Sequence, residues 1–228
     1  MSFDLKHLPQ RFEDLVIADP LNAAVIRSYI DGPPAKPLLL AGPPGAGKTE
    51  AARVIAQNYF SSRNLQNADW ELNGASAGKT FETRIMAEVN YQMFGNPDKA
   101  LIVINEIDEF DLRTVQPALR DFMDSKRHLI RFVATTNFKN RMMGALLSRF
   151  RVLDMLPPQS LDWVNRAIAI LEAEGLHPNR ADVVQILQGF QGNARDLIDL
   201  LEETVLAAQA TNKLPTQQMS TFAGGARK

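Results

Sequence analysis

The chain has 228 residues, of which 45% are hydrophobic and 22% charged, enough apolar material for one large and one small globular domain. Lys and Arg number 25 and Asp and Glu 26, so the net charge of -1 excludes a wholly basic protein that coats nucleic acid but allows a local basic patch. The absence of cysteine excludes disulfides, zinc–thiolate sites and cysteine nucleophiles, and the isolated histidines at 7, 128 and 177 lack metal-ligand spacing.

The first predicted elements are an irregular entry segment and a helix. Residues 1–19 show no periodic pattern and no long apolar run, so we expect no signal peptide. Asp19 can cap a helix that has Pro20 at its first position and extends to about Ile30. The run Asp31-Gly32-Pro33-Pro34 then ends it.

The following segments predict a parallel sheet. Leu38–Ala41 is wholly apolar, as expected for a strand buried on both faces, and precedes a glycine-rich loop and a helix over 48–59. Further strands are predicted at 70–72, 101–104, 132–135 and 152–156, with helical segments between them, for example 81–93 and 114–123. The fold class is therefore α/β, a five-stranded parallel sheet in a first domain of residues 1–156.

A small all-helical lid domain is predicted after Pro157-Pro158, over residues 157–213. Its three helices are expected near 160–174, 180–190 and 193–211, and in the last one five residues share a face, namely Leu197, Leu200, Leu201, Thr204 and Val205. Residues 214–228 have the composition of a disordered tail. No stretch approaches the roughly 18 apolar residues of a membrane span, so we expect no membrane partner and a cytoplasmic location.

The glycine-rich loop carries the strongest functional signal. Gly42-Pro43-Pro44-Gly45-Ala46-Gly47-Lys48-Thr49 matches G-x-x-x-x-G-K-[ST] at every fixed position. Glycines let backbone N–H groups point at phosphate oxygens, and the following helix places its positive end on the same anion. Lys48 would neutralise the β and γ phosphates and Thr49 would ligate Mg²⁺, so ATP and Mg²⁺ are the predicted cofactors. A second Gly-Lys-Thr at 78–80 has Asn73 in place of the first glycine, which predicts an ordinary loop.

A polar pair ends the strand predicted at 101–104. In P-loop ATPases a strand beside the P-loop strand delivers a carboxylate to the Mg²⁺ shell, and the next residue, a glutamate, polarises the attacking water. Glu106 fits the second role. Asn105 stands at the first position, where its amide keeps an oxygen but lacks the charge that Mg²⁺ prefers, which predicts weakened metal affinity and reduced hydrolysis. Asp108 is assigned to the same site, whereas Glu109 and Asp111 fit a solvated loop.

At this point the chain resembles the AAA+ superfamily, and within it the clamp-loader ATPase subunits of DNA replication, over residues 11–211. Asn105–Asp108 looks like the family's D-E-x-D box with its first letter changed, and Gln116–Asp124 resembles its helix Q-x-A-L-R-x-x-M-E. Further matches are the N-terminal segment Arg11–Val16, the strand end Ala134–Asn137, Ser148-Arg149-Phe150 for Ser-Arg-Cys, and Gly192–Arg195 for G-x-x-R.

The resemblance implies a role for each matched polar residue. Asn137 is then the sensor-1 residue that helps to place the attacking water, and Arg195 the sensor-2 residue of the lid. Arg149 is an arginine finger that reaches the γ phosphate of a neighbouring subunit. The resemblance also implies that five residues contact nucleic acid or connect the ATP site to DNA: Lys79, Arg84, Arg113, Gln116 and Arg120. The alternative for each of them is an ordinary solvated surface residue.

The function implied is an oligomeric ATP-dependent switch, built from copies of this chain or related subunits, that opens or loads a sliding clamp on primed DNA. The alternatives are another DNA-acting AAA+ ATPase (branch migration or helicase loading), a catalytically weak partner subunit, or a protein remodeller. A remodeller is disfavoured because residues 73–80 contain no aromatic pore-loop residue. The family's helical collar domain has no counterpart here; assembly by the ATPase domains alone, a collar from a partner, or a truncated chain would each explain this.

Overall fold

The structure is a computed structural model that describes residues 2–32, 36–62, 71–74, 78–94 and 99–211. Residue contacts divide the chain into a sheet unit, Pro9–Pro157, and a helical unit, Met1–Leu8 with Pro158–Lys228. The predicted tail, 214–228, lies outside the described residues. Among the residues described, none of the helices has the length and apolarity needed to cross a membrane.

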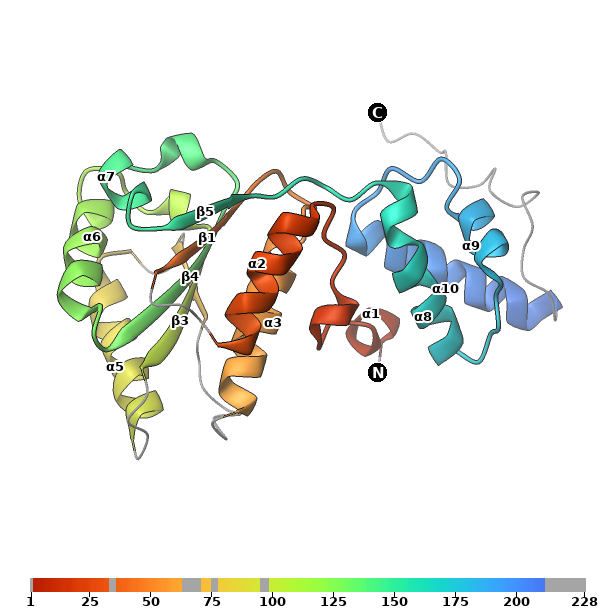
Figure 1. The fold of residues 1–228 in the computed structure, drawn as a ribbon, viewed down its shortest axis with the longest axis horizontal. Coiled ribbons are helices and arrows are strands. Elements are labelled where there is room, and N and C mark those ends of the chain that lie inside the picture. The colour runs from red at the N-terminus through yellow and green to blue at the C-terminus, as the bar shows by residue number, and fades with distance from the viewer. Residues whose placement is uncertain (1, 33–35, 63–70, 75–77, 95–98, 212–228) are drawn as a thin grey trace. The chain divides into compact units, whose positions relative to one another are not determined.

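A five-stranded parallel sheet forms the centre of the sheet unit, with strand order β2-β3-β4-β1-β5 (Figure 1). The strands are β1 (Leu38–Ala41), β2 (Glu71–Asn73), β3 (Ala100–Asn105), β4 (Ile130–Thr136) and β5 (Arg151–Asp154). This confirms the predicted α/β class and the five parallel strands. The last strand is shorter than predicted, ending at Asp154 instead of Leu156, and Trp70 of the predicted second strand lies outside the described residues.

The strand order corrects one prediction. The strand that ends in Asn105 was expected beside the P-loop strand, but β4 lies between β3 and β1. Apolar runs such as these identify buried strands without specifying which neighbour each one has, so the sequence pattern could not give the order. As a consequence, Thr135 and Thr136 at the polar end of β4 lie between the glycine-rich loop and the acidic turn that follows β3, residues 106–109.

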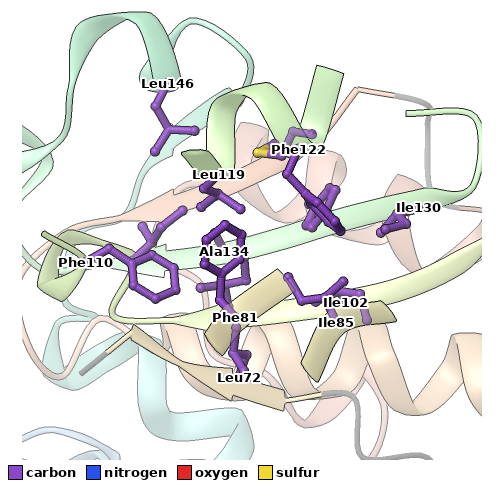
Figure 2. Packing of buried hydrophobic residues seen from close by; sticks show 14 of the residues in the cluster. Leu72, Phe81, Ile85, Ile102, Phe110, Leu119, Phe122, Ile130, Ala134 and Leu146 are labelled. Atoms are coloured by element: carbon purple, nitrogen blue, oxygen red, sulfur yellow. The ribbon is translucent and has the colours of Figure 1, made fainter. Parts of the chain in front are cut away.

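Helices cover both faces of the sheet. On one face lie α2 (Pro20–Asp31) and α3 (Lys48–Ser61); on the other lie α5 (Phe81–Met93), α6 (Val115–Lys126) and α7 (Gly144–Leu147). Strand β3 serves both cores, since Leu101 and Val103 pack toward α3 while Ile102 packs toward α5 and α6 (Figure 2). Short 3-10 turns complete the unit: η1 (Phe12–Asp14), η2 (Gly78–Thr80), η3 (Ile107–Glu109) and η4 (Lys139–Arg141).

The start of α2 follows the predicted capping. The Asp19 carboxylate accepts a hydrogen bond from the Leu21 backbone N–H at 2.8 Å, and Pro20 occupies the first helical position. The Asn22 side chain donates to the Asp154 carbonyl at 2.9 Å, which ties α2 to the end of β5. These two contacts position α2 on the face of the sheet that α3 also covers.

The helical unit contains α1 (Phe3–Lys6), η5 (Ser160–Trp163), α8 (Val164–Ala173), α9 (Arg180–Ile186) and α10 (Ala194–Thr211). Leu197, Leu201, Thr204 and Val205 of α10 are buried, as their shared helical face predicts, whereas Leu200 is half-buried. Asn179 caps α9 by accepting from the Asp182 N–H at 2.9 Å. This helix is shorter than predicted and ends at Ile186.

The first residues differ from the irregular entry segment that the sequence predicts. They form α1, and the buried His7 ring places its Nε2 2.6 Å from Glu174 Oε1 in the helical unit. Arg166 donates to the His7 carbonyl at 2.6 Å, and Lys6 Nζ lies 2.7 Å from the same Glu174 oxygen. The hydrogen bond from Lys6 lowers the pKa of Glu174. Such polar contacts between distant residues have no periodic pattern in the sequence.

Candidate functional site

The glycine-rich loop runs from the end of β1 to the N-terminus of α3. Gly47 directly precedes α3 and has φ 78°, a left-handed conformation that favours glycine. At Gly42 a Cβ atom would lie 2.1 Å from the Met155 carbonyl oxygen, so the chain after β5 can approach the loop only because this residue is glycine. These glycines let the backbone turn sharply in front of a helix N-terminus, the arrangement that binds phosphate in P-loops.

Lys48 is buried in this loop. Its Nζ donates to the carbonyls of Gly42 at 2.8 Å and Pro43 at 2.7 Å. Burial lowers the pKa of the Lys48 amine, and the nearby carboxylates of Asp108 and Glu106 oppose that shift. Thr49, the next residue, is exposed in the first turn of α3. The loop therefore encloses a cation and presents a hydroxyl beside it.

An acidic turn follows β3 at the same edge of the sheet. Asn105 and Asp108 are buried, at 5% and 7% exposure. Glu106 has φ 53° and is the single non-glycine residue with positive φ in the part of the chain that is described. Asp108 accepts from the Thr136 hydroxyl at 2.6 Å and from the Asn137 N–H at 3.3 Å. This places Asn137 against the acidic turn.

The end of β4 joins the loop to the acidic turn. Gly42 N–H donates to the Thr136 carbonyl at 3.2 Å, and Glu106 N–H donates to the Thr135 hydroxyl at 3.2 Å. The Glu106 carboxylate also accepts from the Asn73 side-chain amide at 3.2 Å. Asn73, Thr135 and Thr136 are not among the predicted site residues. The strand order would have revealed them, because it brings the ends of β2, β3 and β4 together.

The groups at this edge fit Mg-ATP. The buried Lys48 ammonium and the N-terminus of α3 favour a phosphate anion, and the oxygens of Thr49 and Asn105 are the hard donors that Mg²⁺ takes. Within the described ranges, no group of three or more His, Cys, Asp or Glu residues is arranged to hold a metal ion by itself.

Arg149 lies on the surface of the sheet unit, just before β5. Its Nη2 is 2.8 Å from Asp124 Oδ2 and its Nε 3.3 Å from Asp124 Oδ1, while Nη1 donates to the Ala145 carbonyl at 2.8 Å. The hydrogen bond from Arg149 lowers the pKa of the Asp124 carboxyl. Arg149 is thus held at the end of α6, and its role as a finger stays a prediction.

Four further predicted residues lie on helices α5, α6 and α10 or on the turn before α6. Arg195 is exposed at the start of α10 in the helical unit, where its N–H donates to the Asn193 side chain at 2.8 Å. Arg84 on α5 and Arg113 before α6 are exposed. Arg120 pairs with the neighbouring Asp121, its Nη2 at 2.5 Å from the carboxylate. The side chain of Lys79 lies outside the described part of the chain.

The environment of Gln116 differs from one of the two alternatives that the sequence allowed. Its side chain has 0% exposure, which contradicts the alternative of a solvated helix face, while its role in connecting the ATP site to DNA stays a prediction. Its amide nitrogen donates to the carbonyls of Phe110 at 3.0 Å and Arg141 at 3.1 Å, and its oxygen accepts from Met143 N–H at 2.7 Å. Gln116 therefore joins α6 to the turns on either side of it.

Replacing Gln116 with leucine should destabilise the fold by about 2–6 kcal/mol. The buried Phe110 carbonyl left without a partner costs about 1–3 kcal/mol, and the less buried groups of Arg141 and Met143 each lose a hydrogen bond worth about 0.5–1.5 kcal/mol. Chemical denaturation monitored by circular dichroism would measure the loss. The matched control is Asn90→Leu, an amide-to-leucine change on an exposed position of α5, which should change stability by less than about 0.5 kcal/mol. Equal stability of the two variants would contradict the bridging role.

Sequence comparison identifies relatives along most of the chain. The pattern of the ATPase family associated with various cellular activities (AAA) matches residues 38–157. The chain is 27% identical over 212 residues to replication factor C small subunit 1 of Pyrobaculum arsenaticum, which covers 92% of this chain and 62% of that protein. It is 27% identical over 199 residues to the replication factor C small subunit of Methanothermobacter thermautotrophicus, covering 86% and 61%. The chain thus spans about three fifths of the length of these curated relatives.

Solved structures share the fold at lower identity. The Thermotoga maritima RuvB Holliday junction branch migration motor superposes with a TM-score of 0.70 at 18% identity, over 94% of this chain and 70% of that one. Domain III of the replication initiation protein DnaA from the same organism gives 0.61 at 16% identity, over 90% and 91%. At these identities the likeness shows the fold alone.

Proposed function

Because this chain belongs to the AAA family of ATPases, we propose that it is an ATP-hydrolysing switch that assembles with copies of itself or with related subunits and acts in DNA replication as a clamp loader. The observation that carries the proposal is that Lys48, Glu106 and Asn137 lie close together, just after the ends of β1, β3 and β4. The role as a clamp loader is supported by the replication factor C small subunits among the relatives of this chain.

The chemistry follows from the residues at the sheet edge. The backbone of Gly42–Gly47 and the Lys48 ammonium hold the β and γ phosphates, and Thr49 and Asn105 contact Mg²⁺ directly or through water. When bound, Mg²⁺ supplies positive charge that neutralises the phosphate oxygens. Glu106 orients the attacking water from one side, and Asn137, fixed against Asp108, orients it from the other.

Assembly completes the switch. Arg149 reaches the γ phosphate of the neighbouring subunit, and Arg195 contacts the nucleotide from the lid, so subunit contacts depend on that phosphate. Hydrolysis removes it and shifts the population toward a looser assembly. Arg84, Arg113 and Arg120, with Lys79, offer cations for the DNA backbone.

The test is the rate of ATP hydrolysis with and without a primed-template DNA. We expect primed DNA to raise the rate about tenfold at 50 mM salt, and the stimulation to fall steeply toward 200 mM salt because phosphate contacts release counterions. A four-way junction and an unfolded protein serve as the competing effectors. Stronger stimulation by the junction would favour branch migration, stronger stimulation by the protein would favour remodelling, and a rate unchanged by any DNA would contradict the proposal.

A further inference from the structure

Asn105 stands where P-loop ATPases place a carboxylate, and the neighbouring strand offers a physical reason. The Asn105 side-chain amide is buried and has partners on both of its ends. Its Oδ1 accepts from the Thr135 hydroxyl at 3.1 Å. Its Nδ2 donates to Oε1 of Glu71, a residue on β2, the strand at the end of the sheet order.

The register explains how Glu71 reaches this position. On β2, Asn73 stands opposite Asn105 and Glu71 stands opposite Val103, two residues earlier along the neighbouring strand. Side chains two residues apart on a strand point to the same face of the sheet. Glu71 therefore lies on the same face as Asn105, and its longer side chain extends toward the strand end.

The hydrogen-bonding capacity of its neighbours determines which end of the Asn105 amide faces β2 and which end faces β4. The Glu106 N–H can only donate, so the Thr135 hydroxyl accepts from it and keeps its own proton available for Asn105 Oδ1. At the other end the Glu71 carboxylate can only accept, so it must face an N–H group. An amide meets both demands, whereas an aspartate at this position would place a carboxylate oxygen against the oxygen of Glu71.

We propose that Glu71 is a positioning residue for Asn105: it binds Nδ2 and thereby holds Oδ1 toward the end of β4 and the metal side of the site. Asn105 and Glu71 work as a matched pair of one amide and one carboxylate, so the asparagine is an adaptation to its neighbour. The part of this proposal that concerns Mg²⁺ rests on the proposed ATPase function. The pairing itself does not.

Thermal unfolding without nucleotide or Mg²⁺ tests the pairing. We expect Asn105→Asp to lower the Tm by roughly 4–8 °C, because two carboxylates in contact repel, and Glu71→Gln to lower it by less than about 2 °C, since glutamine can still accept from Asn105. The double variant N105D/E71Q should recover at least half of the loss, because it restores one amide and one carboxylate. The control N105D/E172Q, which neutralises an exposed carboxylate on α8, should recover none.

Two outcomes would overturn the pairing: an N105D chain as stable as the wild type, or equal recovery by E71Q and E172Q. Because this measurement needs no ATP, it stands even if the chain hydrolyses none, so failure of the ATPase proposal and failure of the pairing are distinguishable.

The Mg²⁺ dependence of ATP hydrolysis tests the positioning. Glu71→Ala removes the acceptor, and we expect it to raise the Mg²⁺ concentration for half-maximal rate about tenfold, the lower end of the loss seen when a residue that orients a metal ligand is removed. Glu71→Gln keeps the acceptor and should stay within about twofold of the wild type. An unchanged Mg²⁺ dependence in E71A, or an equal shift in E71Q, would overturn the positioning role.

Discussion

Replacing Lys48 with alanine is expected to lower the rate of ATP hydrolysis by at least about 100-fold, the scale of loss when one group that stabilises transition-state charge is removed. The structure gives the reason. The Lys48 ammonium is buried within the loop, where its Nζ binds the carbonyls of Gly42 and Pro43, and no second lysine is within hydrogen-bond reach of these two carbonyls among the described contacts. A bound nucleotide would take over these contacts from the carbonyls.

Nucleotide affinity should fall with the activity. Titration with a fluorescent ATP analogue would measure it, and we expect a loss of about 10-fold or more, since one favourable charge contact with phosphate is worth more than about 1.4 kcal/mol. The matched control is Lys99→Ala, which removes a half-buried ammonium that donates to the Arg127 carbonyl. Lys99 directly precedes β3, so it lies at the end of that strand opposite to Asn105. Unchanged affinity in the Lys48 variant would show that the nucleotide binds elsewhere.

Replacing Arg149 with alanine should lower hydrolysis in the assembled protein by about 10³-fold, as expected for an arginine that acts from a neighbouring subunit. Binding of the ATP analogue by the isolated chain should stay within about twofold of the wild type, because in this structure Arg149 contacts Asp124, Ala145 and Ser148 and not the loop. Arg180→Ala is the control: it removes a surface arginine of the helical unit that donates to Asn165. A loss of nucleotide binding in the Arg149 variant would contradict the finger role.

Mixing the two inactive variants gives the sharpest test of action between subunits. In a mixed assembly a Lys48→Ala chain still carries Arg149 and can present it to a neighbour whose own loop is intact. Equal amounts of the two variants should therefore recover a measurable fraction of the wild-type rate, about a quarter if neighbours pair at random. No recovery, in an assembly shown to contain both variants, would place Arg149 outside the neighbour's site.

Local sequence features predicted the elements well. The apolar runs identified all five parallel strands, and capping by Asp19 and Pro20 set the start of α2. The loop before α3 was recognisable because its chemistry requires a contiguous run of glycines and Lys48, so spacing along the chain preserves it. The roles assigned to Glu106, Asn137, Arg149 and Arg195 rest on short motifs and remain predictions.

Contacts between distant segments were the part that the sequence could not supply. The order of the strands, the pairing of His7 with Glu174 and the burial of Gln116 each depend on residues at least 25 positions apart. Gln116 illustrates the difficulty: a polar residue on an amphipathic helix normally faces water. Here the backbone groups of two turns provide all its partners, and these turns are recognisable only in three dimensions.

The backbone of Glu106 carries a consequence for how this chain can evolve. A side chain with a Cβ atom at φ 53° has a conformation that glycine would adopt at lower energy. Selection for thermal stability alone would therefore favour glycine over glutamate at this position. In a chain that no longer needed to cleave ATP, substitution of Glu106 by glycine would be expected to raise stability. If Glu106 serves hydrolysis as proposed, a carboxylate at this left-handed position marks selection for catalysis over stability.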